Sequence, residues 1–552
     1  MGMHGAVTDI LARRRSLIAF WLGCAAVAAG VLTHVPMFLM GRHNHYVLAG
    51  MPMGTAMIWG MAAIVAGIAL AGYGLVPLRS GTAPGSIEPI APPENAPLSV
   101  RHWMVAGLLA LALVIDIMKP ASLGFVTPGM RAEYSISNAT VAWLPFAALT
   151  GTAVGSFVWG ALADLYGRRG AILLSAVMFI GTSICGAMPS FWWNVAMCFL
   201  MGAAAGGMLP VAYALLAEIM PTRHRGWCLV LIGGVGAIGG FFASSGFSAL
   251  LQPTFGWRVM WLLNFPTGLL LVLMSPLLPE SARFLQLMGR ADEARAMLAR
   301  FGVVGRAEDH TDRLDVRDHR SSQRPVPGNG HGLLGITGAL TLTALAWSLV
   351  NFGVLLWLPS ALVGEGQSVG AASALIARST LIAAPVVLVS AWLYSNWSTR
   401  GSLMLMVGIT TCGLLGVQLR SHGFSLFGNT VFDLTLLIIG TSGVIAMLLP
   451  YTSESFPLRV RGRATGWVAG CSKLGGLFAQ TLSVFGAAPA LSAAALAITA
   501  PSIAALLLLA WFGRETRQRD LRELEAEHGI ALHRSSHPAP VRASVDGARS
   551  WR

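Results

Sequence analysis

Charged side chains are scarce in this chain of 552 residues: only 11% are Asp, Glu, Lys or Arg, whereas 55% are hydrophobic. A soluble chain of this size would carry about twice that share of charge. The arginines cluster in short loops between apolar runs and near the two ends of the chain, as in the cytoplasmic loops of membrane proteins. The formal charge of +13 could indicate a protein that binds nucleic acid, but this placement of the arginines argues against it. The placement makes a lipid bilayer the expected surrounding.

Cysteine is also scarce, and none of the six cysteines has the spacing of a metal site. All six lie inside apolar runs, where cysteine acts as a small packing residue. The chain lacks the His-Glu-x-x-His, Gly-x-Ser-x-Gly and Walker motifs of zinc peptidases, hydrolases and ATPases. We therefore expect no enzyme, no metal site and no cofactor, and an ion gradient rather than ATP as the energy source.

Apolar runs that are long enough to cross a bilayer recur along the whole chain. The predicted spans are residues 16–40, 55–77, 103–128, 139–163, 171–188, 191–217, 227–251, 258–279, 333–358, 369–394, 402–419, 430–450, 464–485 and 489–512. An even total of about fourteen spans places both termini on one side, and the arginine clusters place that side in the cytoplasm. The first run follows three arginines, as in a signal peptide, but its length and the second span favour a helix pair. The expected location is a bacterial inner membrane.

One stretch of the sequence occurs twice, at residues 218–226 and again at residues 454–462. The residues Glu218, Pro221, Arg223, Arg225 and Gly226 recur at an offset of 236 as Glu454, Pro457, Arg459, Arg461 and Gly462. Each copy lies between two apolar runs. A long repeat with several spans per copy suggests a membrane protein built from two halves. Similar membrane-surface turns alone would explain the pair, but neighbouring motifs are duplicated as well.

The repeat predicts an all-α polytopic membrane protein with two pseudo-symmetric six-helix bundles and an N-terminal helix pair. The predicted segments are a two-helix membrane extension (1–77), a linker (78–102), an N-terminal six-helix bundle (103–279), a cytoplasmic central loop (280–332), a C-terminal six-helix bundle (333–512) and a cytoplasmic tail (513–552). Apolar residues at helical spacing from Phe284 to Phe301 predict an amphipathic helix on the membrane surface. A short helix is also expected at 521–528.

Residues 160–169 read Gly-Ala-Leu-Ala-Asp-Leu-Tyr-Gly-Arg-Arg. This stretch resembles the loop signature of the major facilitator superfamily, Gly-x-Leu-x-Asp-x-x-Gly-Arg-Arg. Residues 279–283, Pro-Glu-Ser-Ala-Arg, resemble the motif after the sixth helix of sugar-porter-like members, and residues 515–517 are similar to the element that closes the second half there. The corresponding second-half turn, residues 396–401, keeps one Arg but has Asn for Asp and Thr for Gly. The resemblance covers about residues 103–525, so the first helix pair lies outside the usual twelve-helix plan.

The resemblance implies that acidic and basic side chains at the cytoplasmic helix ends form a gate. Ion pairs that are weak on an open surface become a latch where a closing interface partly removes them from water. The alternative is that these charges only orient the helices during insertion. The implied gate residues are Asp164, Gly167, Arg168, Arg169, Glu218, Arg225, Glu280, Arg283, Glu454, Arg461 and Glu515.

The chain has only two lysines, Lys119 and Lys473, and both lie inside apolar runs. Ionisable groups inside a membrane span cost several kcal/mol and are candidates for function. Asp116 lies on the same helical face as Lys119, and Pro120 breaks the helix there. The alternatives are a self-satisfied Asp116–Lys119 pair and a Lys473 that is bonded to carbonyl groups. The functional hypothesis is a central site with excess positive charge, in which Asp116 carries a proton. The candidate substrate- and proton-binding residues are Asp116, Lys119, Asn351, Arg378, Lys473 and Gln480.

Together these features predict a secondary transporter that works by alternating access, with proton-coupled symport of a small organic anion as the leading hypothesis. Proton-coupled efflux of drugs or metabolites stays open, because the glycine-rich run 233–240 is suggestive of an antiporter motif, although it lacks that motif's proline and spacing. A non-transporting membrane sensor is a further alternative, and loss of the gate motifs would mark it. A copper-handling transporter is the last alternative, because the first helix pair carries thioether and imidazole groups at helical spacing, and these groups suit copper. These ligands are His34, Met37, Met40, Met53, Met57 and Met61, and packing is their other explanation.

Overall fold

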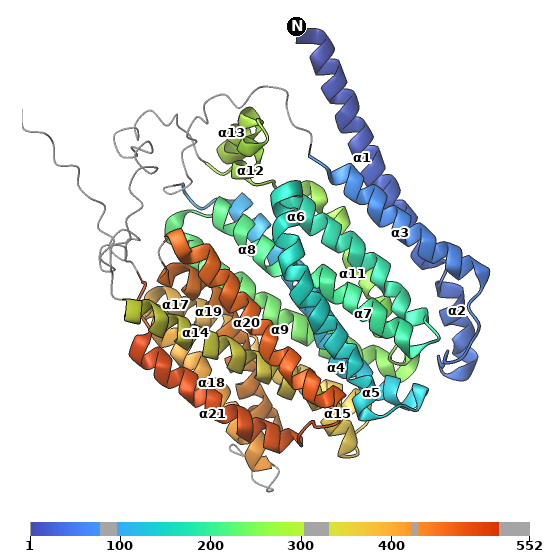
Figure 1. Cartoon of the computed structure of the whole chain (residues 1–552), viewed down its shortest axis with the longest axis vertical. Helices are drawn as coiled ribbons and strands as arrows, with labels where there is room; N and C mark the ends of the chain where they lie inside the picture. Colours follow the sequence, from blue (N-terminus) through green and yellow to red (C-terminus); the bar gives the residue numbers. More distant parts are fainter. Residues whose placement is uncertain (1, 78–95, 303–329, 421–428, 457, 518–552) are drawn as a thin grey trace, which may run out of the picture.

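The computed structural model describes residues 2–77, 96–302, 330–420, 429–456 and 458–517. These residues are almost entirely helical, and no strand occurs among them (Figure 1). Within this part of the chain, eleven helical segments are long and apolar enough to cross a membrane. The predicted all-α membrane fold is therefore confirmed. The predicted helix at 521–528, the tail beyond residue 517 and most of the predicted linker and central loop lie outside the described residues.

Glycines mark where the predicted spans and the observed helices begin and end. Helix α6 (Trp143–Thr182) covers parts of two predicted spans, and its non-helical backbone at Gly167 lies between them. Conversely, α7 (Phe191–Ala205) and α8 (Met208–Ile219) divide one predicted span between them. The number of membrane crossings depends on whether an interrupted helix is counted as one or as two. The count of fourteen therefore stays a prediction.

The N-terminal helix pair consists of α1 (Gly2–Leu32) and α3 (Thr55–Leu75), joined by α2 (Val35–Met40) and the short helix η1 (Gly41–Asn44). Glycines bring the two long helices into backbone contact, because a Cβ added at Gly23 would lie 2.4 Å from the amide nitrogen of Ala71. Small residues are what allow membrane helices to approach so closely. The pair also packs against α6. The side chains of Met37 and Met57, two of the proposed copper ligands, are buried in an apolar cluster with Leu48.

The first bundle comprises the helices from α4 to α11. Their bounds are α4 (Val100–Tyr134), α5 (Asn138–Val141), α6, η2 (Ser183–Ala187), α7, α8, α9 (Thr222–Phe255), α10 (Val259–Leu262) and α11 (Asn264–Leu273). The helices η3 (Ser275–Leu277), α12 (Ala282–Leu287) and α13 (Ala291–Arg300) follow. The predicted amphipathic helix is thus two short helices. Gly289, whose φ of 74° only glycine adopts readily, lies in the turn between them.

The second bundle comprises the helices from α14 to α21. Their bounds are α14 (Gly330–Leu349), the π-helix η6 (Val350–Leu355), α15 (Leu356–Gly364), α16 (Val369–Ala383), α17 (Val386–Asn396), α18 (Thr399–Arg420), α19 (Thr430–Ser455), α20 (Leu458–Val484) and α21 (Leu491–Phe512). The two bundles meet where α9 packs against α16, α17 and α19, where α20 packs against α6, and where α15 packs against α4. Figure 1 shows α12 and α13 at one end of the bundles and α5 and α15 at the other. We call these the arginine-rich end and the opposite end.

A buried ion pair fastens the N-terminal pair to the first bundle at the opposite end. Glu133 and Arg258 are 5% and 0% exposed, and their carboxylate and guanidinium atoms are 2.6 Å apart. Glu133 also accepts hydrogen bonds from the backbone N–H groups of Leu48 and Ala49, at 2.8 and 3.0 Å, and from the indole of Trp257 at 2.7 Å. One carboxylate therefore joins α4, the segment before α10 and the loop between α2 and α3.

We expect Glu133→Gln to destabilise the protein by about 3–5 kcal/mol, the cost of leaving a buried guanidinium without its counter-charge. The matched control is Glu365→Gln, which removes the Glu365–Arg420 ion pair, whose glutamate side chain is 54% exposed. That change should cost about 0–1 kcal/mol. The measurement is the free energy of unfolding of each purified variant in mixed micelles. Equal losses in the two variants would show that Glu133 has no anchoring role.

Candidate functional site

The two lysines of the chain meet one carboxylate between the bundles. Asp116 and Lys119 lie on α4 of the first bundle and are 6% and 1% exposed. Lys473 lies on α20 of the second bundle and is half-buried. Asp116 interacts electrostatically with both ammonium groups. The structure thus brings three of the predicted site residues together from segments more than 350 residues apart in the sequence.

Two buried polar atoms of this cluster, Lys119 Nζ and Asp116 Oδ1, have no hydrogen-bond partner among the described residues. The ammonium group of Lys119 lies instead 3.0 Å from the centroid of the Phe179 ring, a cation–π contact. An unsatisfied buried donor costs about 1–3 kcal/mol. Native proteins keep such groups where a ligand or a proton supplies the missing partner.

The π-helix η6 lines the second-bundle side of the cluster. The ring centroid of Phe352 in η6 lies 5.6 Å from Lys473 Nζ. A π-helical turn leaves carbonyl groups outside the ordinary ladder of hydrogen bonds, and such turns are frequent at functional sites. Gln480, which is 1% exposed, donates a hydrogen bond to the Phe352 carbonyl. Its amide nitrogen is therefore engaged by the backbone. Asn351, also in η6, is half-buried.

Two further charges inside the apolar spans lie apart from this cluster. The side chain of Arg378 on α16 is exposed and is not among the charges that act on Asp116. Asp433 on α19, which is 1% exposed, has two carboxylate oxygens without a hydrogen-bond partner among the described residues. Sequence reasoning did not select Asp433, because its position near a helix end is also typical of an interfacial residue.

At the arginine-rich end, Glu280 closes the loop that interrupts α6. Its carboxylate oxygen Oε1 accepts hydrogen bonds from the backbone N–H groups of Arg168 (2.8 Å), Arg169 (3.3 Å) and Ser281 (2.9 Å). Gly167 has a φ of 84°, and a Cβ atom there would lie 2.4 Å from Glu280 Oε2. Only glycine allows the carboxylate to approach the loop in this way. Burial raises the pKa of Glu280, while these hydrogen bonds and the charge of Arg169 oppose the rise.

The ion pairs of this loop are more exposed. Arg168 pairs with Asp164 at 3.1 Å and with Glu218 at 3.6 Å, and the side chain of Asp164 is 79% exposed. Exposed pairs of this kind stabilise a protein by about 0.2–1 kcal/mol. Arg225 donates to the Met220 carbonyl at 3.4 Å. Arg283 is exposed at the start of α12.

In the second bundle, Glu515 occupies the place that Glu280 has in the first. It accepts hydrogen bonds from the backbone N–H and the hydroxyl of Thr399, at 2.9 and 2.7 Å, and from the hydroxyl of Ser398. The second-half turn departs from the family signature, but its hydroxyl groups replace the missing donors. Burial acts to raise the pKa of Glu515, yet the hydrogen bonds together hold that pKa below its ordinary value.

Glu454 lies where the two bundles touch at this end. It accepts hydrogen bonds from the hydroxyls of Tyr394 (2.7 Å) and Thr516 (2.8 Å). A Cβ added at Gly226 of the first bundle would lie 3.0 Å from Glu454 Oε1. Arg461 acts on Glu454 electrostatically and donates to the Phe456 carbonyl at 3.3 Å. The predicted gate residues thus divide into one cluster in each bundle, with Gly226 at the contact between the bundles.

We expect Gly167→Ala to destabilise the protein by about 1–2 kcal/mol, because an alanine at positive φ is strained and its Cβ would collide with the Glu280 carboxylate. The control is Gly160→Ala on the same helix, where an added Cβ meets no heavy atom within 4 Å. That variant should be neutral or more stable. Unfolding free energies of the two variants test this, and a Gly167→Ala protein as stable as wild type would contradict it.

The two glutamates predict opposite dependences on pH. Because the pKa of Glu280 is raised from 4.5, its contribution to stability is largest below that pH and is lost as the pH rises through the folded-state pKa. The pKa of Glu515 is lowered from 4.5, so its contribution is complete above that pH and is lost as the pH falls through the folded-state pKa. The unfolding midpoints of wild type, Glu280→Gln and Glu515→Gln across pH 3–7 measure this. Equal slopes for the two variants would exclude it.

Comparison with known proteins identifies the family. The sequence model of the Major Facilitator Superfamily matches residues 108–480. The chain is 25% identical to the niacin transporter NiaP of Acinetobacter baylyi, over 70% of this chain and 87% of that protein. It is 27% identical to the gallate transporter of Pseudomonas putida, over 70% and 86% of the two chains. The solved xylose transporter XylE of E. coli has the same fold, with a TM-score of 0.61 at 15% identity over 76% of this chain and 100% of that one. The chain belongs to the Major Facilitator Superfamily of membrane transporters.

Proposed function

We propose that this protein is a secondary active transporter that carries a small aromatic carboxylate together with a proton, by alternating access between its two bundles. The observation that carries the proposal is the meeting of Lys119 and Lys473, from different bundles, at the single carboxylate of Asp116. Two cations and one anion leave an excess of positive charge inside the membrane, and a substrate anion would neutralise it. Niacin and gallate, named for two relatives, are aromatic carboxylates.

The surroundings of the lysines favour an aromatic substrate. Phe179 lies against the Lys119 ammonium and Phe352 lies near that of Lys473. A carboxylate held between the two ammonium groups would place its own ring beside these phenyl groups, where offset or edge-to-face contacts are favourable. The substrate would also displace Lys119 from the Phe179 ring and supply the hydrogen-bond acceptor that this ammonium group lacks. Asn351 and Gln480 in the same region stay proposed polar contacts. Arg378, which the sequence also predicts as a site residue, is exposed and lies apart from the lysines, so it is not part of the proposed cluster.

Proton coupling follows from competition for the lysines. Ionised Asp116 attracts both ammonium groups, so a substrate anion must replace it as their partner. Protonation of Asp116 removes this competitor, and proton and anion therefore bind together. Because the lysines belong to different bundles, the bound anion also draws the bundles together. Binding and release of the substrate can thus shift the equilibrium between conformations.

Access to the site requires movement, because Asp116 and Lys119 are almost fully covered in this conformation. On α20, Gly462, Gly466 and Gly470 have open space where a Cβ would be. They lie four residues apart, on the helical face that carries Lys473 one turn further on. This face supports a path from the arginine-rich end to the site. We infer that this end, with both termini, faces the cytoplasm, since arginine-rich loops stay on that side. We also propose a bacterial inner membrane as the location. We also propose that the protein is divided at the domain boundaries that the sequence predicts.

Export is the competing function, and the glycine-rich run at 233–240 was the sequence feature in its favour. In the structure these glycines let α9 approach α4 closely: a Cβ at Gly236 would lie 2.7 Å from Leu113 and one at Gly240 would lie 2.8 Å from Ile117. Close helix packing explains the run without an antiport function. The charge of the site bears on the class of substrate and not on the direction of transport, which the uptake experiment below tests.

We expect Lys119→Ala and Lys473→Ala each to lower substrate uptake at least tenfold, since a lost charge-assisted hydrogen bond costs about 1.5–3 kcal/mol. The measurement is uptake of labelled nicotinate, benzoate and gallate into proteoliposomes with an imposed inward proton gradient. Asp433→Asn is the matched control, because it neutralises a buried charge away from the cluster and should transport like wild type. Uptake that is indifferent to both lysines would sink the proposal and direct attention to export of neutral or cationic compounds.

We expect Asp116→Asn to bind substrate but to lose the dependence of uptake on the proton gradient, because its side chain no longer titrates. Counterflow without a gradient should continue, whereas accumulation against a concentration gradient should stop. Asp433→Asn again serves as the control and should keep its proton dependence. An Asp116→Asn protein that still accumulates substrate in proportion to the gradient would remove Asp116 from the coupling step.

A further inference from the structure

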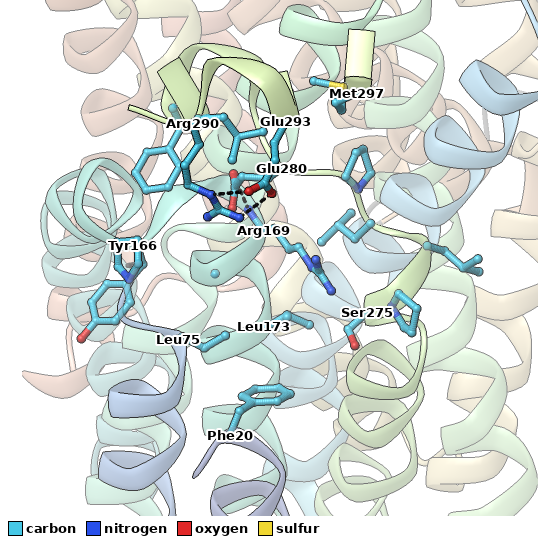
Figure 2. A pocket seen from close by; sticks show the side chains of 18 of the residues that line it. Phe20, Leu75, Tyr166, Arg169, Leu173, Ser275, Glu280, Arg290, Glu293 and Met297 are labelled. Carbon is cyan, nitrogen blue, oxygen red and sulfur yellow. Dashed lines mark hydrogen bonds and ion pairs between the residues drawn. The ribbon is translucent and has the colours of Figure 1, made fainter. Parts of the chain in front are cut away.

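A cavity of about 690 Å³ lies at the arginine-rich end, away from the contact between the bundles (Figure 2). Its walls come from the N-terminal pair (α1 and α3), the first bundle (α4 and α6), and the segment from η3 to α13. The gate residues Arg169 and Glu280 belong to its lining. The N-terminal pair and α13 thus form two walls of a partly open cavity beside these predicted gate residues.

The polar part of the cavity carries more positive than negative charge. Four arginines (Arg101, Arg169, Arg290 and Arg300) line it, against the two glutamates Glu280 and Glu293. Arg290 pairs with Glu293 through two contacts of 3.0 and 2.6 Å. Glu280 is engaged by three backbone N–H groups. The guanidinium groups in excess over these pairs have room for an anionic ligand.

Among these arginines, Arg169 most clearly lacks a hydrogen-bond partner. Its Nε atom is buried and has no hydrogen-bond partner among the described residues. Its charge interacts with Glu280, whose Oε1 atom already accepts hydrogen bonds from the backbone of the loop. Figure 2 shows Arg169 beside Glu280, between the Arg290–Glu293 pair on one side and Phe20 and Leu75 on the other. A second anion in the cavity would complete its hydrogen bonds.

The other part of the cavity is apolar and reaches the membrane-facing surface of the helix pair. Leu17, Phe20 and Trp21 of α1 and Leu75 of α3 line it. Leu17 is 59% exposed and Trp21 is 39% exposed. Both lie on a helix that is apolar enough to cross a membrane, so the exposed side of this wall adjoins lipid. An occupant must therefore have an anionic head and an apolar tail.

We propose that the cavity binds an anionic phospholipid of the adjoining leaflet, with its phosphate at Arg169 and Arg300 and its acyl chains along α1 and α3. Basic pockets between membrane helices bind such headgroups. The guanidinium group matches a phosphate in geometry as well as in charge. A lipid phosphate at Arg169 also shares this cation with Glu280, so occupation of the cavity alters the electrostatics of the first-bundle gate cluster. The N-terminal pair is then a lipid-sensing element of the transporter.

The test is a lipid titration of the full-length, delipidated protein in detergent, followed by the thermal unfolding midpoint. We expect short-chain phosphatidylglycerol to raise the midpoint more than phosphatidylcholine with the same chains. Arg300→Gln and Arg169→Gln should each weaken the apparent affinity for phosphatidylglycerol about tenfold and leave the response to phosphatidylcholine unchanged, which shows that the variants are folded. Arg295→Gln is the matched control, because it lies on the same helix but outside the cavity lining.

Three results would overturn the proposal. Wild-type affinity in both cavity variants would place the lipid elsewhere. An equal loss in Arg295→Gln would mean that diffuse surface charge attracts the lipid. Glycerol phosphate, a soluble headgroup without acyl chains, serves as the last probe. If it stabilised the protein as well as phosphatidylglycerol at equal concentration, the cavity would be a site for free anions.

Discussion

The structure depends on the high cost of a charge in an apolar medium. Asp116 and Lys119 are buried, Lys473 is half-buried beside them, and one carboxylate interacts with two ammonium groups. No arrangement of these three satisfies every group, because one anion cannot neutralise two cations. These three side chains therefore cannot neutralise one another completely. An anionic substrate or a proton would change the net charge of the cluster. Since the lysines come from opposite bundles, this charge balance is also linked to how the bundles lie against each other.

The arginine-rich end relies on a different use of charge. Glu280 and Glu515 each bind the backbone N–H groups of the loop that connects two helices of their own bundle. These hydrogen bonds hold each loop within one bundle, while Glu454 and Gly226 lie at the contact between the bundles. Each loop is thus held by a carboxylate of its own bundle. This division suits bundles that move as units.

The N-terminal pair is fastened to the first bundle at both ends. At the opposite end, Glu133 holds the loop after α2 through two backbone N–H groups. At the arginine-rich end, α1 and α3 enclose the cavity beside Arg169 and Glu280. Between the ends, glycines bring α1 and α3 into backbone contact, and Ile64 packs against Gly181 of α6. The described contacts of the pair thus join it to the first bundle along its whole length.

Sequence alone determined the all-α membrane fold and the family, because apolar run length, loop charge and motif identity are local properties that survive without knowledge of contacts. It also singled out Asp116 and both lysines, since a charge in an apolar run is conspicuous wherever it lies. Only the tertiary structure decided what these residues meet. The partnership of Asp116 with Lys473, the substitution of Thr399 and Ser398 for the missing loop donors, the Glu133–Arg258 pair and the cavity around Arg169 all join segments that are distant in the chain. No helical periodicity encodes such partners, because period describes which face of a helix is buried and says nothing about which helix covers it.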